Sequence, residues 1–119
     1  MSEMNKIISG TREANYVCSR EDLIANSGVC VLLGEAQVAV FYLPEESPSV
    51  YGISNWDPIG KANVLSRGIV GDVDGELVVA SPLYKQHFSL ITGRCVEQEE
   101  LAVRTFDIVL DGADVLLRS

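Results

Sequence analysis

The chain has 119 residues and a mass of 12.9 kDa, which is the size of a single domain that can bury a hydrophobic core. Hydrophobic residues make up 47% and charged residues 22% of the sequence, so its composition excludes a wholly disordered chain. The formal net charge of −8 argues against nucleic acids and anionic membrane surfaces as partners, because both require a basic binding face.

Taken in chain order, the sequence predicts one short strand after another. Tyr16–Cys18 is the first. Ser19 is followed three residues later by an acid, which favours a capped helical turn that Leu23–Ala25 could complete. Further strands are predicted at Val29–Leu33, Gln37–Leu43, Val50–Ser54, Ile69–Gly71, Leu77–Ala80, Phe88–Leu90, Val103–Leu110 and Val115–Leu117.

Turn residues separate several of these runs. Gly34 stands between two apolar runs, and the dipeptide Asp74-Gly75 is typical of a tight hairpin loop. Asp111–Ala113 forms the turn of a closing hairpin. Asn55–Gly68 and Ser81–Gln86 contain few β-branched residues and are predicted to be ordered loops.

Roughly eight to ten short strands with almost no helical periodicity predict an all-β fold, an antiparallel β-sandwich or small barrel. We find no internal repeat, linker or low-complexity tract. We therefore expect one domain over residues 1–119, with a short N-terminal tail before a core at about residues 13–118. No apolar run approaches a bilayer span and no signal peptide is recognisable, so we expect a cytoplasmic protein.

The cysteines and the single histidine limit the possible metal and redox chemistry. Cys18, Cys30 and Cys95 are odd in number and widely spaced, which favours buried reduced thiols over disulfides or a redox thiol. His87 is the only histidine, so any site that needs two is excluded. A zinc finger, a Rieske-type two-iron centre and a thioredoxin-like pair all fail this test.

Two acidic segments have simple interpretations. Asp72–Glu76 faintly resembles the start of a calcium loop, but it lacks the later acidic ligands, so we predict a hairpin turn. Glu97–Glu100 is interpreted as a solvated turn.

The stretch Ser81–Gly93 carries a resemblance. It reads S-P-L-Y-K-Q-H-F-S-L-I-T-G, and it resembles the second cluster-binding loop of Rieske ferredoxins, C-P-x-H-x-x-x-F-x-x-x-T-G. Ser81 stands in place of the cysteine ligand and Tyr84 in place of the histidine. Upstream, Asn55 and Asp57 take the two ligand positions of the first loop.

In one branch of the Rieske-like superfamily the loop motifs are kept while the ligand residues are replaced. It comprises the small subunits of assimilatory NAD(P)H-dependent nitrite reductase, which keep the fold and have lost the iron ligands. The sequence looks like this branch at Asn55–Pro58, Asn63–Gly68 and Ala80–Gln86, and the resemblance covers roughly residues 13–118. It implies a Rieske-like fold with two loops at one end.

The four substituted positions do not suit a cluster. A Rieske centre uses two thiolates and two imidazoles, whereas these positions offer an amide, a carboxylate, a hydroxyl and a phenol. We therefore expect no catalytic residue, cofactor or metal in this chain. The resemblance places flavin, a [4Fe–4S] cluster and sirohaem on the large subunit.

The resemblance implies an accessory subunit that stabilises or positions the large catalytic subunit, which reduces nitrite to ammonium in nitrate assimilation. No activity is expected of the chain alone. Two other functions stay open at this point: an electron carrier of the Rieske ferredoxin type, and a stand-alone protein-binding module.

The two loops of Rieske ferredoxins form the tip that faces the partner, which implies where a partner would bind here. The candidate contacts are Trp56, Arg67, Tyr84, Lys85 and His87. Each has a plainer interpretation: Trp56 could close the end of the core, His87 could be scaffold, and the charges could be simply solvated.

Overall fold

The structure is a computed structural model, and it describes residues 7–9 and 15–118. No helix in these ranges is long and apolar enough to span a bilayer. The strands are β1 (Ile7–Ser9), β2 (Tyr16–Ser19), β3 (Ser27–Leu33), β4 (Ala36–Tyr42), β5 (Val50–Ser54), β6 (Trp56–Asp57), β7 (Ala62–Asn63), β8 (Ile69–Val73), β9 (Glu76–Ala80), β10 (His87–Ser89), β11 (Thr105–Phe106), β12 (Ile108–Asp111) and β13 (Asp114–Leu117). Two short 3₁₀ turns, η2 (Arg20–Asp22) and η3 (Leu65–Arg67), complete the described elements.

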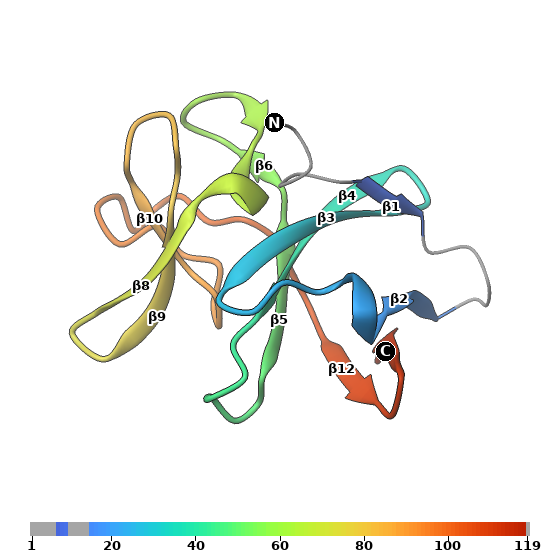
Figure 1. Cartoon of the computed structure of the whole chain (residues 1–119). Coiled ribbons are helices and arrows are strands. Elements are labelled where there is room, and N and C mark those ends of the chain that lie inside the picture. Colours follow the sequence, from blue (N-terminus) through green and yellow to red (C-terminus); the bar gives the residue numbers. More distant parts are fainter. Residues whose placement is uncertain (1–6, 10–14, 119) are drawn as a thin grey trace.

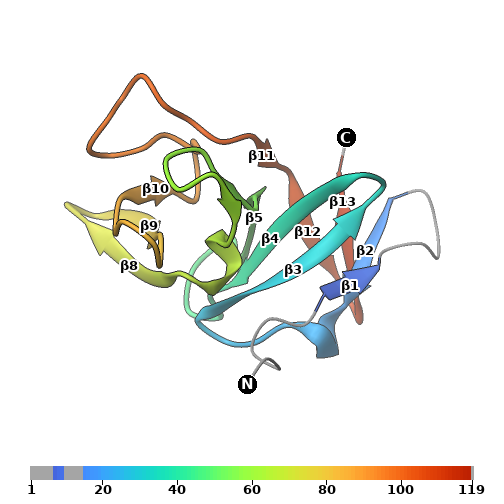
Figure 2. The ribbon, with the colours of Figure 1, turned by 90° about the horizontal axis from the view of Figure 1, so that it is seen from above.

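A five-stranded sheet in the order β1-β3-β4-β5-β11 lies between two three-stranded sheets. The sheet β10-β9-β8 flanks it on one side and the sheet β12-β13-β2 on the other, as the view from above shows (Figure 2). The ribbon β6–β7 projects from the end of β5 (Figure 1). Every strand pair is antiparallel except β1 with β3, and no sheet closes into a barrel. The predicted all-β sandwich is therefore confirmed, and the barrel alternative is wrong.

Strand β4 explains this layered arrangement. Its side chains alternate between the two faces of the sheet, yet the four residues Val38–Phe41 are all fully buried. Ala39 and Phe41 pack into a core with Phe88 of β10, whereas Val38 and Val40 pack into a second core with Val115 of β13. The continuous apolar run of β4 thus reflects burial on both faces, with one core on each side of the large sheet.

The predicted hairpins form with the expected turn chemistry. Leu33 of β3 pairs with Ala36 of β4 across Gly34, whose φ of 63° is left-handed. The β8–β9 hairpin turns at Asp74 and Gly75, which both have positive φ, as the two-residue type I′ loop requires. The hairpin interpretation of this acidic segment is confirmed.

Four local predictions differ from the structure. The helical turn is η2 alone: Ser19 and Asp22 form the predicted capping box, but Leu23 is extended because it packs against the second core. The predicted strand over 103–110 is split at Asp107, where the chain leaves the large sheet as β11 and joins a small one as β12. The first long loop contains β6, β7 and η3. Strand β1 precedes the predicted core boundary at residue 13 and already belongs to the large sheet.

Candidate functional site

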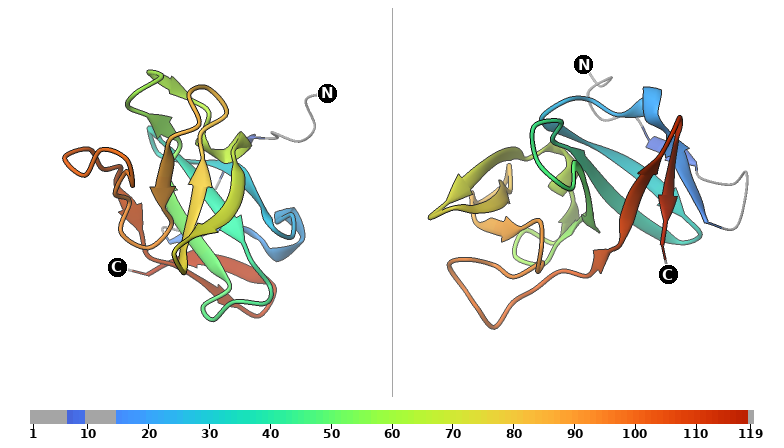
Figure 3. Two further views of the ribbon diagram at one scale, coloured as in Figure 1. Left: turned by 90° about the vertical axis from the view of Figure 1, so that its left-hand side faces the viewer. Right: turned by 90° about the horizontal axis from the view of Figure 1, so that it is seen from below.

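The two segments with the Rieske-like motifs lie side by side at one end of the molecule (Figure 1 and the left view of Figure 3). The first covers residues 55–64 after β5, and the second covers residues 81–86 between β9 and β10. Together they are termed the loop tip. The hairpin of β12 and β13, which contains the C-terminal residues of the described chain, lies at the opposite end (Figure 1).

Asn55 anchors the first loop to its surroundings. Its side chain is buried and donates from Nδ2 to Gln37 Oε1 at 3.1 Å, and its Oδ1 accepts the Ser66 backbone N–H at 2.6 Å. Nδ2 also approaches Cys30 Sγ at 3.5 Å. The backbone of Asn55 donates to Gln37 O and accepts from Leu65 N. One side chain thus ties the end of β5 to β4 and to η3.

Asp57 and Ser81 join the two loops directly. Both side chains are fully buried, and the Ser81 hydroxyl donates a hydrogen bond to Asp57 Oδ2. The other carboxylate oxygen accepts the backbone N–H groups of Ile59 at 2.8 Å and Gly60 at 3.0 Å. A buried carboxylate must be compensated by hydrogen bonds, and here three donors do so. The Ser81–Asp57 hydrogen bond therefore cross-links the two loops at two of the four ligand-like positions.

Both loops repeat one five-residue turn, D-P-I-G-K at 57–61 and S-P-L-Y-K at 81–85. In each turn the N–H of the final lysine donates to the carbonyl of the first residue, at 2.7 Å for Lys61 and 3.1 Å for Lys85. The side chain of each first residue also accepts the N–H of its third residue. The two pentapeptides share only the proline and the lysine, so the likeness lies in the hydrogen-bond pattern of the turn rather than in a sequence repeat.

The final residue of each turn has a left-handed backbone, with φ of 58° at Lys61 and 67° at Lys85. For a residue with a β-carbon this conformation costs about 1–2 kcal/mol. The other described non-glycine residues with positive φ are Asn26 and Asp74, whose side chains tolerate this conformation best. Lysine is therefore a costly choice that both turns share.

The fourth residue of the turn differs between the two loops because the loops touch there. A β-carbon on Gly60 would lie 2.4 Å from Leu83 Cδ1, so glycine lets the Leu83 side chain approach the first loop closely. Tyr84, at the same position of the second turn, is instead 63% exposed. Among the described residues, no hydrogen bond joins Tyr84 to the other three ligand-like positions.

The loop tip presents apolar side chains to solvent. Trp56 is 43% exposed and Leu83 is 44% exposed, in addition to Tyr84. Arg67 and Lys85 are exposed as well, so four of the five predicted contact residues are available on the surface.

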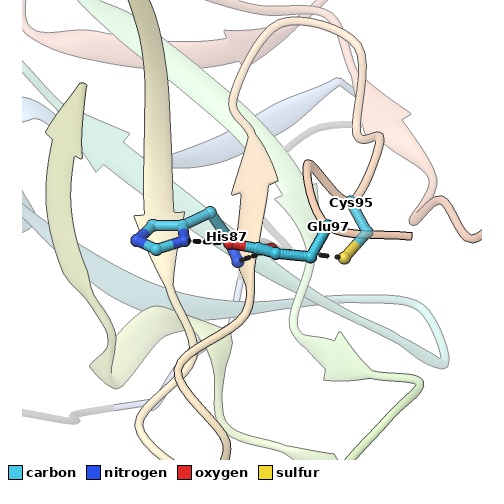
Figure 4. Close-up of polar contacts among 3 residues, drawn as sticks. All are labelled: His87, Cys95 and Glu97. Atoms are coloured by element: carbon cyan, nitrogen blue, oxygen red, sulfur yellow. Dashed lines mark hydrogen bonds and ion pairs between the residues drawn. The ribbon is translucent and has the colours of Figure 1, made fainter. Parts of the chain in front are cut away.

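His87, the fifth predicted contact, is occupied within the protein. Its Nδ1 lies 2.6 Å from Glu97 Oε2, and its backbone N–H donates to Glu97 Oε1 at 2.9 Å (Figure 4). The Cys95 thiol approaches the same carboxylate at 3.8 Å. Burial raises the pKa of Glu97, but the hydrogen bonds from the His87 backbone and ring outweigh it, so the net pKa is below its ordinary value. Glu97 was interpreted only as part of a solvated turn, and its role in holding β10 was missed.

The three cysteines are free and buried, as predicted. Burial raises the pKa of all three thiols, to about 12 for Cys18, where the Asp22 carboxylate adds to the effect. Such thiols are poor nucleophiles and poor metal ligands at neutral pH. Among the described residues, no three His, Cys, Asp or Glu side chains gather to form a metal site.

The ligand-like positions do not fit a Rieske cluster. Asn55, Asp57 and Ser81 provide no soft donor, and protein hydrogen bonds already occupy their side chains. Tyr84 is turned to solvent. The arrangement is suited to holding two loops in a fixed shape and to presenting that shape to a partner.

Known proteins share this fold and sequence. Residues 14–118 match the Rieske-like [2Fe–2S] domain family. The NADH nitrite reductase small subunit of Escherichia coli strain K12 is 44% identical over 102 residues, which are 86% of this chain and 94% of that protein. The NMR structure of the E. coli protein NirD has a TM-score of 0.77 and 41% identity, covering 87% of this chain and 94% of that one.

A third similarity is to part of a longer protein. A Klebsiella oxytoca protein named nitrite reductase [NAD(P)H] large subunit is 38% identical over 105 residues, which are 88% of this chain and 11% of that protein. The domain therefore occurs both alone and within a large subunit. With the layered sheets and the two paired loops, these similarities show that the chain belongs to the Rieske-like [2Fe–2S] domain family, among the small subunits of NAD(P)H-dependent nitrite reductase.

Proposed function

We propose that this protein is a non-catalytic small subunit of NAD(P)H-dependent nitrite reductase in the cytoplasm, and that its loop tip binds the large subunit. The large subunit would carry the flavin, [4Fe–4S] cluster and sirohaem that reduce nitrite to ammonium. The similarity to part of a Klebsiella protein named large subunit supports this partner, because a domain like this one is there part of the same polypeptide as the large subunit.

The observation that carries the proposal is the construction of the loop tip. The Asp57–Ser81 hydrogen bond and the Gly60–Leu83 contact fix its shape, while Trp56 and Tyr84 stay exposed. Exposed aromatic side chains on a rigid frame are typical binding hot spots, because little conformational entropy is lost on binding.

The donor set supports a role without an iron–sulfur cluster. Hard oxygen and amide groups, held by hydrogen bonds, replace the two thiolates and two imidazoles of a Rieske centre. Anaerobic reconstitution with iron and sulfide tests this: the protein is expected to stay colourless. Stoichiometric iron with charge-transfer absorption would instead favour the ferredoxin alternative.

Titration of variants against the purified large subunit tests the docking site. Tyr84→Ala removes an exposed aromatic group and is expected to weaken binding by about 2 kcal/mol, or nearly thirtyfold. Leu83→Ala is expected to weaken binding in the same direction. Ile24→Ala is the matched control for Leu83→Ala, because both side chains are 44% exposed and Ile24 lies beside η2, away from the loop tip.

Circular dichroism shows whether each variant keeps its fold. Wild-type affinity in both loop-tip variants would exclude the loop tip as the docking site. A wild-type chain that does not bind the large subunit at all would contradict the proposed function itself.

A further inference from the structure

The loop tip, taken together with the adjoining residues 65–68 and 87, has a charge opposite to that of the molecule as a whole. Asp57 is the only acidic residue in the segments 55–68 and 81–87, and its carboxylate is buried and hydrogen-bonded. The exposed charges there are those of Lys61, Arg67 and Lys85. The chain as a whole has a net charge of −8, so the loop tip is a positive end on an acidic body.

Lys61, Arg67 and Lys85 have no charged partner among the described residues. In the ranges that the structure describes, none of them forms an ion pair, whereas Arg118 pairs with Asp107 and His87 with Glu97. Their charges are therefore free to act on a partner.

The backbone at Lys61 and Lys85 gives a second, independent reason to assign them a role. Both turns end in a left-handed residue, a position that suits glycine or asparagine better than lysine. The chain uses asparagine at such a position elsewhere, at Asn26. Neither lysine has an intramolecular ion pair in the described chain that would explain its presence. Both turns nevertheless have lysine, a positively charged residue, at this position.

We propose that Lys61 and Lys85 form a matched pair of cationic contacts for a carboxylate-rich surface of the large subunit, placed around the site that accepts Trp56 and Tyr84. This inference rests on the proposed function and adds the chemistry of the partner surface. The two turns have the same hydrogen-bond pattern, so Lys61 and Lys85 stand at equivalent positions. The Ser81–Asp57 hydrogen bond joins the two loops that carry them.

The charge distribution also orients the complex. An acidic partner surface attracts the loop tip and repels the acidic remainder of the small subunit, so approach by any other face is disfavoured. The apolar side chains then provide most of the affinity, while the lysines provide orientation and the rate of association.

The test uses the full chain and the purified large subunit, titrated at about 0.1 M and about 1 M salt, where the Debye length falls from roughly 10 Å to roughly 3 Å. The double variant Lys61→Asn with Lys85→Asn removes both charges and keeps a residue that accepts a left-handed backbone. Its affinity is expected to be about tenfold lower at the low salt concentration and equal to that of the wild type at the high one. Its melting temperature should be no lower than that of the wild type, since asparagine relieves the backbone strain.

Two controls separate a specific contact from general attraction. Lys61→Arg with Lys85→Arg keeps both charges and is expected to bind within about twofold of the wild type. Arg20→Gln removes a positive charge from η2, at the far side of the molecule from the loop tip (Figure 1), and is also expected to stay within about twofold.

Three results would overturn the inference: wild-type affinity in the double asparagine variant at low salt, no salt dependence of binding, or an equal loss in Arg20→Gln. Each of these leaves the proposed function standing as long as the wild-type chain binds and Tyr84→Ala weakens binding. Absence of binding by the wild type at both salt concentrations contradicts the proposed function instead.

Discussion

At the scale of single residues, Asp57 is the side chain on which the loop tip depends most. It is fully buried, and its carboxylate accepts the Ser81 hydroxyl and the backbone N–H groups of Ile59 and Gly60. Hydrogen bonds to charged groups are worth about 1.5–3 kcal/mol, roughly twice as much as those between neutral groups. A pair of short polar side chains thus holds together two loops that a metal cluster holds in a Rieske centre.

Ser81→Ala should destabilise the protein by about 2 kcal/mol, because it removes one donor from a buried carboxylate and leaves the remaining charge less compensated. The free energy of unfolding, measured by urea denaturation, checks this value. The matched control is Ser54→Ala, which removes a half-buried hydroxyl that accepts only the Trp56 backbone N–H, and it should cost less than about 1 kcal/mol.

Trp56 gives a second readout for the same variant. It is the only tryptophan and directly precedes Asp57, so its fluorescence reports on the first loop. Equal stability of Ser81→Ala and the wild type, with an unchanged emission spectrum, would show that the cross-link between the loops is dispensable.

At the scale of elements, the turns decide where the strands can pair. Gly93 follows β10 with φ of 79°, and Gly75 sits in the β8–β9 hairpin with φ of 88°. The two glycines share a left-handed backbone but differ in surroundings. A β-carbon on Gly93 would lie 2.1 Å from the carbonyl oxygen of Val103, whereas one on Gly75 would meet nothing within 4 Å.

Substituting each glycine by alanine separates backbone strain from steric overlap. Gly75→Ala should cost about 1 kcal/mol, which is the cost of the left-handed conformation alone. Gly93→Ala should cost at least about 3 kcal/mol, because the Val103 carbonyl must also move and weaken its neighbouring backbone pairing. Chemical denaturation of both variants measures the difference, and equal costs would contradict the close approach at Gly93.

At the scale of the whole molecule, charged contacts add to the two hydrophobic cores in joining segments that are separate in the sequence. Glu97 lies in the long connection after β10 and binds both the backbone and the ring of His87 (Figure 4). Its pKa is below its ordinary value in the folded protein, because the hydrogen bonds from His87 outweigh the effect of burial. This carboxylate therefore couples the stability of the fold to pH.

The sign of the coupling follows from the lowered pKa. The folded state binds the Glu97 proton more weakly than the unfolded state, so the stabilisation is fully present above the ordinary value of 4.5. It is lost as the pH falls below 4.5 and through the lower pKa of the folded state. The stability difference between the wild type and Glu97→Gln is expected to shrink within this range.

Thermal melts from neutral to acidic pH measure this difference. His87→Ala keeps the backbone donor but removes the ring, so it should lose only part of the pH dependence. A Glu97→Gln variant that follows the wild-type curve throughout would show that this carboxylate does not contribute.

The sequence by itself determined the local structure and the family of this protein. Runs of β-branched residues and turn residues act between near neighbours, so most strands between Tyr16 and Leu117 and the hairpin at Asp74-Gly75 could be predicted, but β6, β7 and the break at Asp107 could not. The Pro, Phe and Thr-Gly spacing after Ser81 was specific enough to indicate the Rieske-like fold. Buried thiols followed from the number and spacing of the cysteines.

Only the tertiary structure decided which side chains meet. Asp57 and Ser81 are 24 residues apart, and their contact depends on how β5 and β9 bring their ends together. Tyr84 stands at one of the four ligand-like positions, yet it is exposed, whereas Asn55, Asp57 and Ser81 are buried. Local patterns specify the conformation of a segment, whereas the partner of a buried polar group is set by the packing of distant segments, which no short stretch of sequence contains.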